Sequence, residues 1–132
     1  MLIIKPIKDK NEQILICAEC GIEYIESHFA YKAYNDGKLL GCAQFDITSE
    51  YAVIDTMRQA NGTLEDFEGM FILGRAVLNF LDLCGTEKAI YCPNDERETR
   101  LAKAIGFKEE NGILTAHLKG MFDAKCEGHC DG

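Results

Sequence analysis

The stretch of the chain from Asn61 to Phe107 limits the fold more than any other. In its first half, apolar residues recur at steps of three and four, a spacing that places them on one stripe of a helix. We expect Thr63 to cap the start of this helix and Gly85 to end it. The expected apolar stripe consists of Phe67, Met70, Phe71, Gly74, Val77, Leu78, Leu81 and Cys84.

A short apolar run, residues 88–92, follows Gly85 and ends at Pro93 and Asn94. Its length and its lack of alternation are typical of a strand that is buried on both faces. A charged helix and the triplet Ile105-Gly106-Phe107 complete the stretch. A helix followed by a buried strand is the pattern of a layered α/β domain.

The rest of the chain predicts a further helix and an antiparallel meander. Asn35-Asp36-Gly37 is a strong turn signal between two apolar runs, so we expect a hairpin there. The other expected elements are a strand at 1–7, a helix at 9–20, strands at 29–34, 39–47 and 51–57, and a final strand at 112–122.

The length and composition are those of one ordinary soluble domain, with 132 residues, 47% of them hydrophobic and 27% charged. We place this domain at 1–122, followed by a tail at 123–132. No run approaches the ~20 apolar residues of a membrane span, and the N-terminus lacks the apolar core of a signal peptide. We therefore expect a cytoplasmic protein without a membrane partner. A net charge of −8 without a basic run argues against nucleic-acid binding.

The sequence contains seven cysteines, and in a reducing cytoplasm we expect thiols rather than disulfides. Cys42, Cys84 and Cys92 lie in apolar runs. Free cysteine is among the residues most often buried in proteins. We therefore expect these three side chains to be small buried apolar groups.

Two further groups of residues suggest a zinc site as an alternative. Cys17 and Cys20 form a C-x2-C pair, and the tail carries Cys126, His129 and Cys130. Four thiolate or imidazole ligands from two segments make a closed structural zinc site. Against this, Cys17 lies in the apolar stripe of the first expected helix. The tail thiols suit a redox or regulatory role equally well, because accessible thiols react most readily.

Three local motifs occur along the chain in a recognisable order. Residues 74–78 read GRAVL, residues 101–107 read LAKAIGF, and Gly41 follows the hairpin turn. Together with the order of the elements, they resemble the GNAT acetyltransferase superfamily, whose corresponding motifs are G-R-A-L-L and L-Y-E-K-L-G-F. The resemblance covers nearly the whole chain. It implies an α/β (α+β) fold with a mixed, mostly antiparallel central sheet and helices on both faces.

The resemblance also implies transfer of an acetyl group from acetyl-CoA, as co-substrate, to a primary amine of a small molecule or peptide. In the family, the pantetheine of the cofactor lies between two diverging central strands. Its pyrophosphate binds at the start of the long helix, where amide hydrogens are unpaired. The implied cofactor-binding residues are Met57, Gln59, Asn61, Gly62, Thr63 and Asn94.

The phosphate loop departs from the family pattern Q/R-x-x-G-x-G/A. Residues 59–64 keep the glutamine and the first glycine but end in Leu64, whereas residues 69–74 are too apolar and already belong to the helix. We prefer the first alignment. The alternative is that Asn61 and Gly62 form a plain turn before the helix, since a short glycine loop is weak evidence without its context.

The catalytic residues are less clearly marked. Attack of an amine on a thioester needs a group that accepts the proton of the amine. The resemblance implies Asp55 in this role, with Glu50 and Glu26 as further candidates; the alternative is that Asp55 caps a turn at the end of its strand. The family's usual acid, a tyrosine, is replaced by Ala102, and Tyr91 and Tyr51 are the candidates to replace it.

The two arginines of the charged helix have two interpretations. Arg97 and Arg100 either bind a phosphate or substrate charge or pair with Glu96 and Glu98 on a solvated face. We favour pairing, because oppositely charged side chains spaced along a helix commonly pair on its surface.

Two functions from different classes remain. One is an N-acetyltransferase, whose amine acceptor is expected to be positively charged because the protein is acidic. The other is a catalytically inactive GNAT-like domain that binds a ligand or partner, or pairs through its sheet as a homodimer, with a Cys/His metal or redox site as an option. The altered loop and Ala102 motivate the second.

Overall fold

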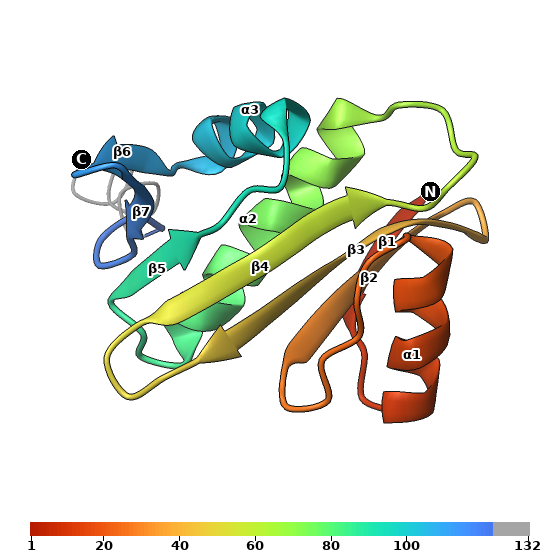
Figure 1. The fold of residues 1–132 in the computed structure, drawn as a ribbon, viewed down its shortest axis with the longest axis horizontal. Helices are drawn as coiled ribbons and strands as arrows, with labels where there is room; N and C mark the ends of the chain where they lie inside the picture. Colours follow the sequence, from red (N-terminus) through yellow and green to blue (C-terminus); the bar gives the residue numbers. More distant parts are fainter. Residues whose placement is uncertain (123–132) are drawn as a thin grey trace, which may run out of the picture.

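The computed structural model describes residues 1–122, which form one mixed sheet with three helices (Figure 1). The strand order is β1-β2-β3-β4-β5-β7-β6. The strands are β1 (Leu2–Pro6), β2 (Phe29–Asn35), β3 (Lys38–Ile47), β4 (Ala52–Gln59), β5 (Lys88–Tyr91), β6 (Lys108–Glu110) and β7 (Ile113–His117). The helices are α1 (Lys10–Glu19), α2 (Phe67–Leu83) and α3 (Glu96–Ile105). The predicted tail residues Cys126, His129 and Cys130 lie outside the described residues.

The helices cover both faces of the sheet, as the resemblance implied (Figure 1). On one face, α2 and α3 pack into a large apolar cluster that includes Phe45, Leu78 and Ile105. On the other face, α1 contributes Ile16 and Cys20 to a much smaller cluster. Among residues 1–122, no helix is both long and apolar enough to span a bilayer.

Strand β4 is the point at which the sheet opens. Its first three residues, 52–54, pair in parallel with residues 89–91 of β5, whereas the other strand pairs are antiparallel. In the pairing with β3, the register shifts so that Asp55 is an extra residue between the paired Ile54 and Thr56. A bulge of this kind bends its strand. Beyond Asp55, β4 continues to Gln59 without β5 beside it, and the two strands diverge (Figure 1).

Helix α2 begins three residues later than predicted. Its N-cap is Asp66, whose carboxylate accepts a hydrogen bond of 2.9 Å from the amide of Gly69. Gly69 allows this close approach, because a Cβ at that position would lie 2.8 Å from Asp66 Oδ2. The prediction of Thr63 as the N-cap is wrong, since its hydroxyl donates to the carbonyl of Ala60 within the preceding loop.

A final strand forms within the predicted range, but it is shorter than predicted. Instead of one strand at 112–122, the chain forms a hairpin from β6 and β7, and β7 ends at His117. Asn111 and Gly112 make the turn with φ values of 55° and 82°. An Asn-Gly pair is a hairpin signal that the sequence contains and that we overlooked. The other predicted elements are confirmed to within two residues at each end.

The expectation for the three isolated cysteines holds only for Cys42, which is buried. Cys84 is exposed because it is the C-cap of α2 and follows its last turn. Cys92 is exposed because it follows the last residue of β5, although its backbone amide still donates to the carbonyl of Ile54 on β4. A cysteine at the end of a helix or strand can therefore be exposed even when its neighbours in the sequence are apolar.

Candidate active site

Two cavities lie beside the diverging part of β4. The first cavity, of about 260 Å³, lies next to the loop 60–66 and the first turn of α2. Five of the predicted cofactor-binding residues line it, and so do Arg58, Arg97 and Glu98. Those five residues are Met57, Gln59, Asn61, Gly62 and Thr63.

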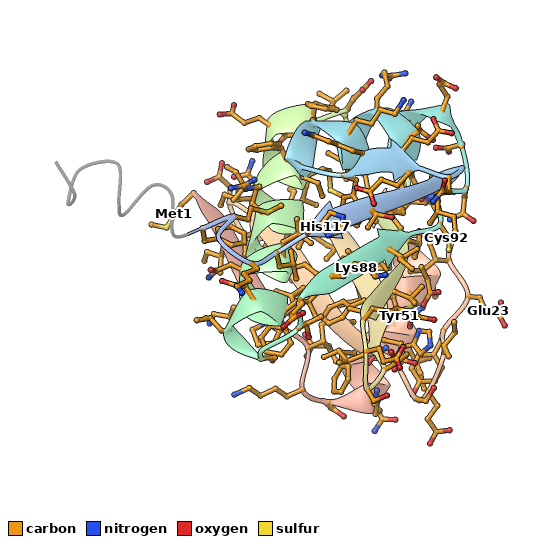
Figure 2. All side chains as sticks on the ribbon, turned by 90° about the vertical axis from the view of Figure 1, so that its left-hand side faces the viewer. Met1, Glu23, Tyr51, Lys88, Cys92 and His117 are labelled. Atoms are coloured by element: carbon orange, nitrogen blue, oxygen red, sulfur yellow. The ribbon has the colours of Figure 1, made fainter. Side chains whose placement is uncertain are left out.

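The second cavity, of about 470 Å³, lies on the face of the sheet that α1 covers. The loop between α1 and β2 forms one wall, and in Figure 2 its Glu23 lies on the same side of the molecule as Cys92. Asp55 and the sixth predicted cofactor residue, Asn94, line this second cavity rather than the first. Arg58 lines both cavities.

The side chain of Gln59 determines the shape of the loop beside the first cavity. Its amide nitrogen donates to Thr63 Oγ1 at 2.9 Å and to the carbonyl of Leu64 at 2.8 Å, and its oxygen accepts from the amide of Asp66 at 2.8 Å. Gly62 has a φ of 84°, and no heavy atom lies within 4 Å of where its Cβ would be. The loop is thus held from inside by Gln59 and open on its outer side at Gly62.

Side chains do not close the start of α2. Leu64 is 91% exposed, and Phe67 is 41% exposed and lines the first cavity. The charges around the helix start are mixed, since Asp66 places its own carboxylate on the first turn while Arg97 lines the cavity. An anion bound here would therefore use the outer side of the loop and Arg97 in addition to the free amides of the helix.

A buried carboxylate lies where β4 and β5 diverge. Glu98 of α3 is 3% exposed. It accepts hydrogen bonds from Thr56 Oγ1 at 3.2 Å, Arg58 Nη2 at 3.0 Å and Tyr91 Oη at 3.1 Å. The backbone and side-chain amides of Asn94 also donate to it, each at 3.2 Å. We call these five residues the Glu98 cluster.

The Glu98 cluster corrects the expected pairing along α3. We expected Glu98 to pair with Arg97 or Arg100 on a solvated face, but Glu98 points inward and pairs with Arg58. Hydrogen bonding to Glu98 raises the pKa of the Arg58 guanidinium. No pattern in the sequence marked Glu98, because a single glutamate among charged residues is usually exposed.

Neither candidate tyrosine is a suitable replacement for the acid that Ala102 lacks. Tyr91 is 2% exposed, and burial followed by the nearby Glu98 charge raises its pKa far above the usual value, so it gives up its proton poorly. Tyr51 precedes β4 at the opposite end of that strand from Gln59, where it lines a separate cavity with Glu50.

Asp55 is paired with His28, which lies just before β2. Its Oδ2 lies 2.5 Å from Nδ1 of His28, and Nε2 of the same ring lies 3.9 Å from Oδ2 of Asp46. The Asp55–His28 contact has the distance of an ion pair but not the angle of a hydrogen bond. Burial raises the pKa of Asp55, and the neighbouring His28 opposes this only in part.

The C-x2-C pair packs into the layer under α1. Cys17 and Cys20 are buried and free, as is Cys42 on β3. The contact between Cys17 and Cys42 lowers the pKa of the Cys17 thiol and raises that of Cys42, which burial raises further. In the described part of the chain, no group of three or more His, Cys, Asp or Glu residues is arranged to hold a metal. Cys17 and Cys20 are therefore packed in this layer, whereas the other ligands of the predicted zinc site lie outside the described residues.

Solved structures with the same architecture identify the fold. An N-acetyltransferase from Staphylococcus aureus Mu50 superposes with a TM-score of 0.67 at 15% identity, over 89% of this chain and 98% of its own. A GNAT family acetyltransferase from Elizabethkingia anophelis with acetyl-CoA bound gives 0.63 at 16% identity, over 89% and 98%. A Bacillus subtilis acetyltransferase in complex with CoA gives 0.69 at 15% identity, over 89% and 99%.

The chain has the GNAT fold. No protein-family model matches the sequence, and no curated protein matches it either. With identities this low, the structures establish the shared GNAT architecture, and the chemistry has to be argued from the residues of this chain.

Proposed function

We propose that this chain is an acyl-CoA-dependent N-acetyltransferase that transfers an acetyl group from acetyl-CoA to a primary amine of a small molecule or peptide. The observation that supports this most is the divergence of β4 from β5 between two cavities, one toward each face of the sheet. Such an arrangement lets a thioester approach from one side and an amine from the other. Two of the GNAT-fold structures contain acetyl-CoA or CoA.

The residues around the first cavity suit the cofactor. In the proposal, Gln59, Asn61, Gly62 and Thr63 form the loop that holds its phosphates, with Met57 and Arg97 beside it. The open space at Gly62 and the cation at Arg97 are the features that suit an anion. When bound, acetyl-CoA supplies the thioester whose acetyl group is transferred.

The second cavity suits the acceptor. We assign Asp55 as the group that takes the proton of the attacking amine, because it lines this cavity and its raised pKa makes it a better base than an ordinary aspartate. Glu23 adds negative charge to the same cavity, which favours a positively charged amine. Because neither Tyr91 nor Tyr51 suits this role, we assign the proton of the leaving thiolate to solvent.

The proposal includes the setting of the protein. The cysteines of the described chain are free, which supports a reducing compartment such as the cytoplasm. A homodimer is one assembly that we propose to test, by sedimentation of the purified protein over a range of concentrations.

Calorimetric titration with CoA tests the function. We expect micromolar binding that weakens at least ~tenfold, about 1.4 kcal/mol, in Gly62→Glu, because the added carboxylate repels the phosphates. Gly85→Glu is the matched control: its φ of 90° and the open space at its Cβ resemble those of Gly62, but it lies beyond the far end of α2. Absence of binding at millimolar CoA would overturn the proposal.

A second candidate is a GNAT-fold domain without catalysis that binds a ligand or partner. Two observations favour it: the Glu98 cluster lies where β4 and β5 diverge, and Asp66 places a carboxylate at the start of α2. Failure to bind CoA in the titration above would support this candidate.

A further inference from the structure

The Glu98 cluster lies between the two cavities. Glu98 lines the first cavity, Thr56 and Asn94 line the second, and Arg58 lines both. The same residues are joined by hydrogen bonds to one carboxylate. The cluster therefore forms the wall that separates the cavities.

This wall joins both sides of the opening in the sheet. Thr56 and Arg58 belong to β4, Tyr91 is the last residue of β5, and Asn94 lies in the loop that leads from β5 to α3. Each of them donates to Glu98, so the carboxylate holds the diverging segments together. A ligand that passes from one cavity to the other has to displace at least part of this network.

The two charged members of the cluster are coupled. A carboxylate that is 3% exposed is costly to bury without a positively charged partner, and Arg58 is that partner. The Arg58 side chain is itself 35% exposed and reaches the first cavity, where it also lies 3.3 Å from Asp95. If an anion in the first cavity attracts the guanidinium of Arg58, Glu98 loses its partner and is driven out of the wall.

We propose that Arg58 and Glu98 close the passage between β4 and β5 until the anionic end of the cofactor binds Arg58. Arg58 is then a cofactor-binding residue, and Glu98 is the positioning residue that holds it and controls access. This inference depends on the proposed function.

Titration of Glu98→Gln with two ligands tests the proposal. Glutamine keeps the shape of the side chain and removes the charge that holds Arg58. CoA has to enter the passage with its pantetheine, whereas adenosine 3′,5′-bisphosphate has the nucleotide phosphates without the pantetheine. We expect Glu98→Gln to bind CoA about tenfold more tightly than the wild type, roughly 1.4 kcal/mol. We expect a clearly smaller gain for the bisphosphate, which benefits from the freed Arg58 but does not enter the passage.

Two further variants complete the test. Glu96→Gln removes the same charge from an exposed position on the first turn of the same helix, and we expect it to leave the affinity for CoA unchanged. Tyr91→Phe removes one hydrogen bond of the cluster and keeps the buried ring, so it gives a smaller gain in CoA affinity even if Glu98→Gln does not fold.

The outcomes separate this inference from the proposed function. If the wild type binds CoA and neither Glu98→Gln nor Tyr91→Phe binds it more tightly, the closed passage is refuted and the proposed function stands. If the affinities for CoA and for the bisphosphate rise by the same factor in Glu98→Gln, the effect is only the loss of a negative charge beside the first cavity. That result also refutes the closed passage. If no variant binds CoA, both proposals fail.

Discussion

The two faces of the sheet are covered in different ways. The face under α2 and α3 carries a continuous apolar cluster in which Phe45, Leu73 and Leu81 are fully buried. The face under α1 carries a small cluster around Cys20 and Cys42, and its buried polar side chains are paired with one another. The first face supplies most of the apolar burial, whereas the second leaves room for the cavity that Asp55 lines.

The smaller face is held together by amide hydrogen bonds. Gln13 of α1 donates to Gln44 of β3 at 2.9 Å. The oxygen of Gln44 also accepts from the amide of Ile25 at 3.1 Å, and its nitrogen donates to the carbonyl of Glu23 at 2.8 Å. Two buried glutamines therefore position the loop that forms one wall of the second cavity. The comparison indicates that the stability of the fold and the positioning of the site depend largely on different faces.

Thiol reactivity gives the largest expected contrast and tests whether the α1 face is closed. Cys17, Cys20 and Cys42 are buried and react only when the protein opens, whereas Cys84 and Cys92 are exposed. Because folded states of small domains are favoured by factors of about 10³ or more, we expect the two groups to differ at least ~1000-fold in alkylation rate. Mass spectrometry of the labelled peptides measures each site separately.

Denatured protein is the control for this labelling, since all of these thiols should then react at similar rates. Rapid reaction of Cys17 or Cys20 in the folded protein would show that α1 separates readily from the sheet. The face under α1 would then also differ from the face under α2 and α3 in how readily it unfolds locally.

Truncation of the larger face is expected to give the largest loss of stability. Phe45 is completely buried and packs against Tyr31 and Phe80 at ring-centroid distances of 6.1 Å. We expect Phe45→Ala to lower the free energy of unfolding by about 3–5 kcal/mol, as measured by urea denaturation. Phe29→Ala is the matched control, because Phe29 pairs with Phe45 across β2 and β3 but is 49% exposed. A loss for Phe45→Ala no larger than that for Phe29→Ala would contradict the assignment of the main core to this face.

Disruption of the glutamine pair is expected to have an intermediate effect. Gln44→Met removes the partners of Gln13 and of the Ile25 amide, and a buried group without a partner costs about 1–3 kcal/mol. Hydrogen exchange at Ile25 should accelerate in this variant, because its amide loses its acceptor. In the double variant Gln13→Leu/Gln44→Met, the free energy of unfolding is expected to fall by less than the sum of the decreases in the two single variants. Additive losses would show that the two amides do not act as a pair.

The smallest effect concerns the pH dependence of stability at Asp55. Because its pKa is raised in the folded protein, the folded state holds this proton more tightly than the unfolded state does. Stability from this group is therefore lost as the pH rises above the usual aspartate value of about 3.9 and through the higher folded value. Asp55→Asn lacks this loss, so its melting temperature relative to the wild type should rise across the same interval and then level off. Melting curves of both proteins in a series of buffers test this, and parallel curves would contradict the raised pKa.

The sequence predicted most of the architecture because its signals are local. The centre of the apolar stripe of α2, the position of β5 and the turn at Asp36 and Gly37 depend on signals over a few residues and are confirmed. The prediction that β5 is buried on both faces is wrong, because only Ala89 and Tyr91, on one face, are fully buried. The errors occurred where a local signal was overlooked, as at Asn111, or where a contact between neighbouring turns decided the outcome, as for the cap at Asp66. Residues 59–63 are consecutive in the chain, and for this reason they line the same cavity.

The rest of the candidate site depends on contacts between residues that are far apart in the sequence. His28 meets Asp55, and Glu98 meets Thr56 and Arg58, only after the sheet has formed. None of these pairs has a spacing that a helix or strand period would reveal.

The sequence by itself determined the order of helices and strands and the apolar positions that form the main core, because periodicity along a chain is sufficient to decide which side of an element is buried. Tertiary structure alone decided that Glu98 is buried, that Cys92 is exposed and that two cavities meet at Arg58. The reason is geometric: the bulge at Asp55 and the end of the β5 pairing place the divergence of the strands, and which side chains fill it depends on the packing of α3 against the sheet.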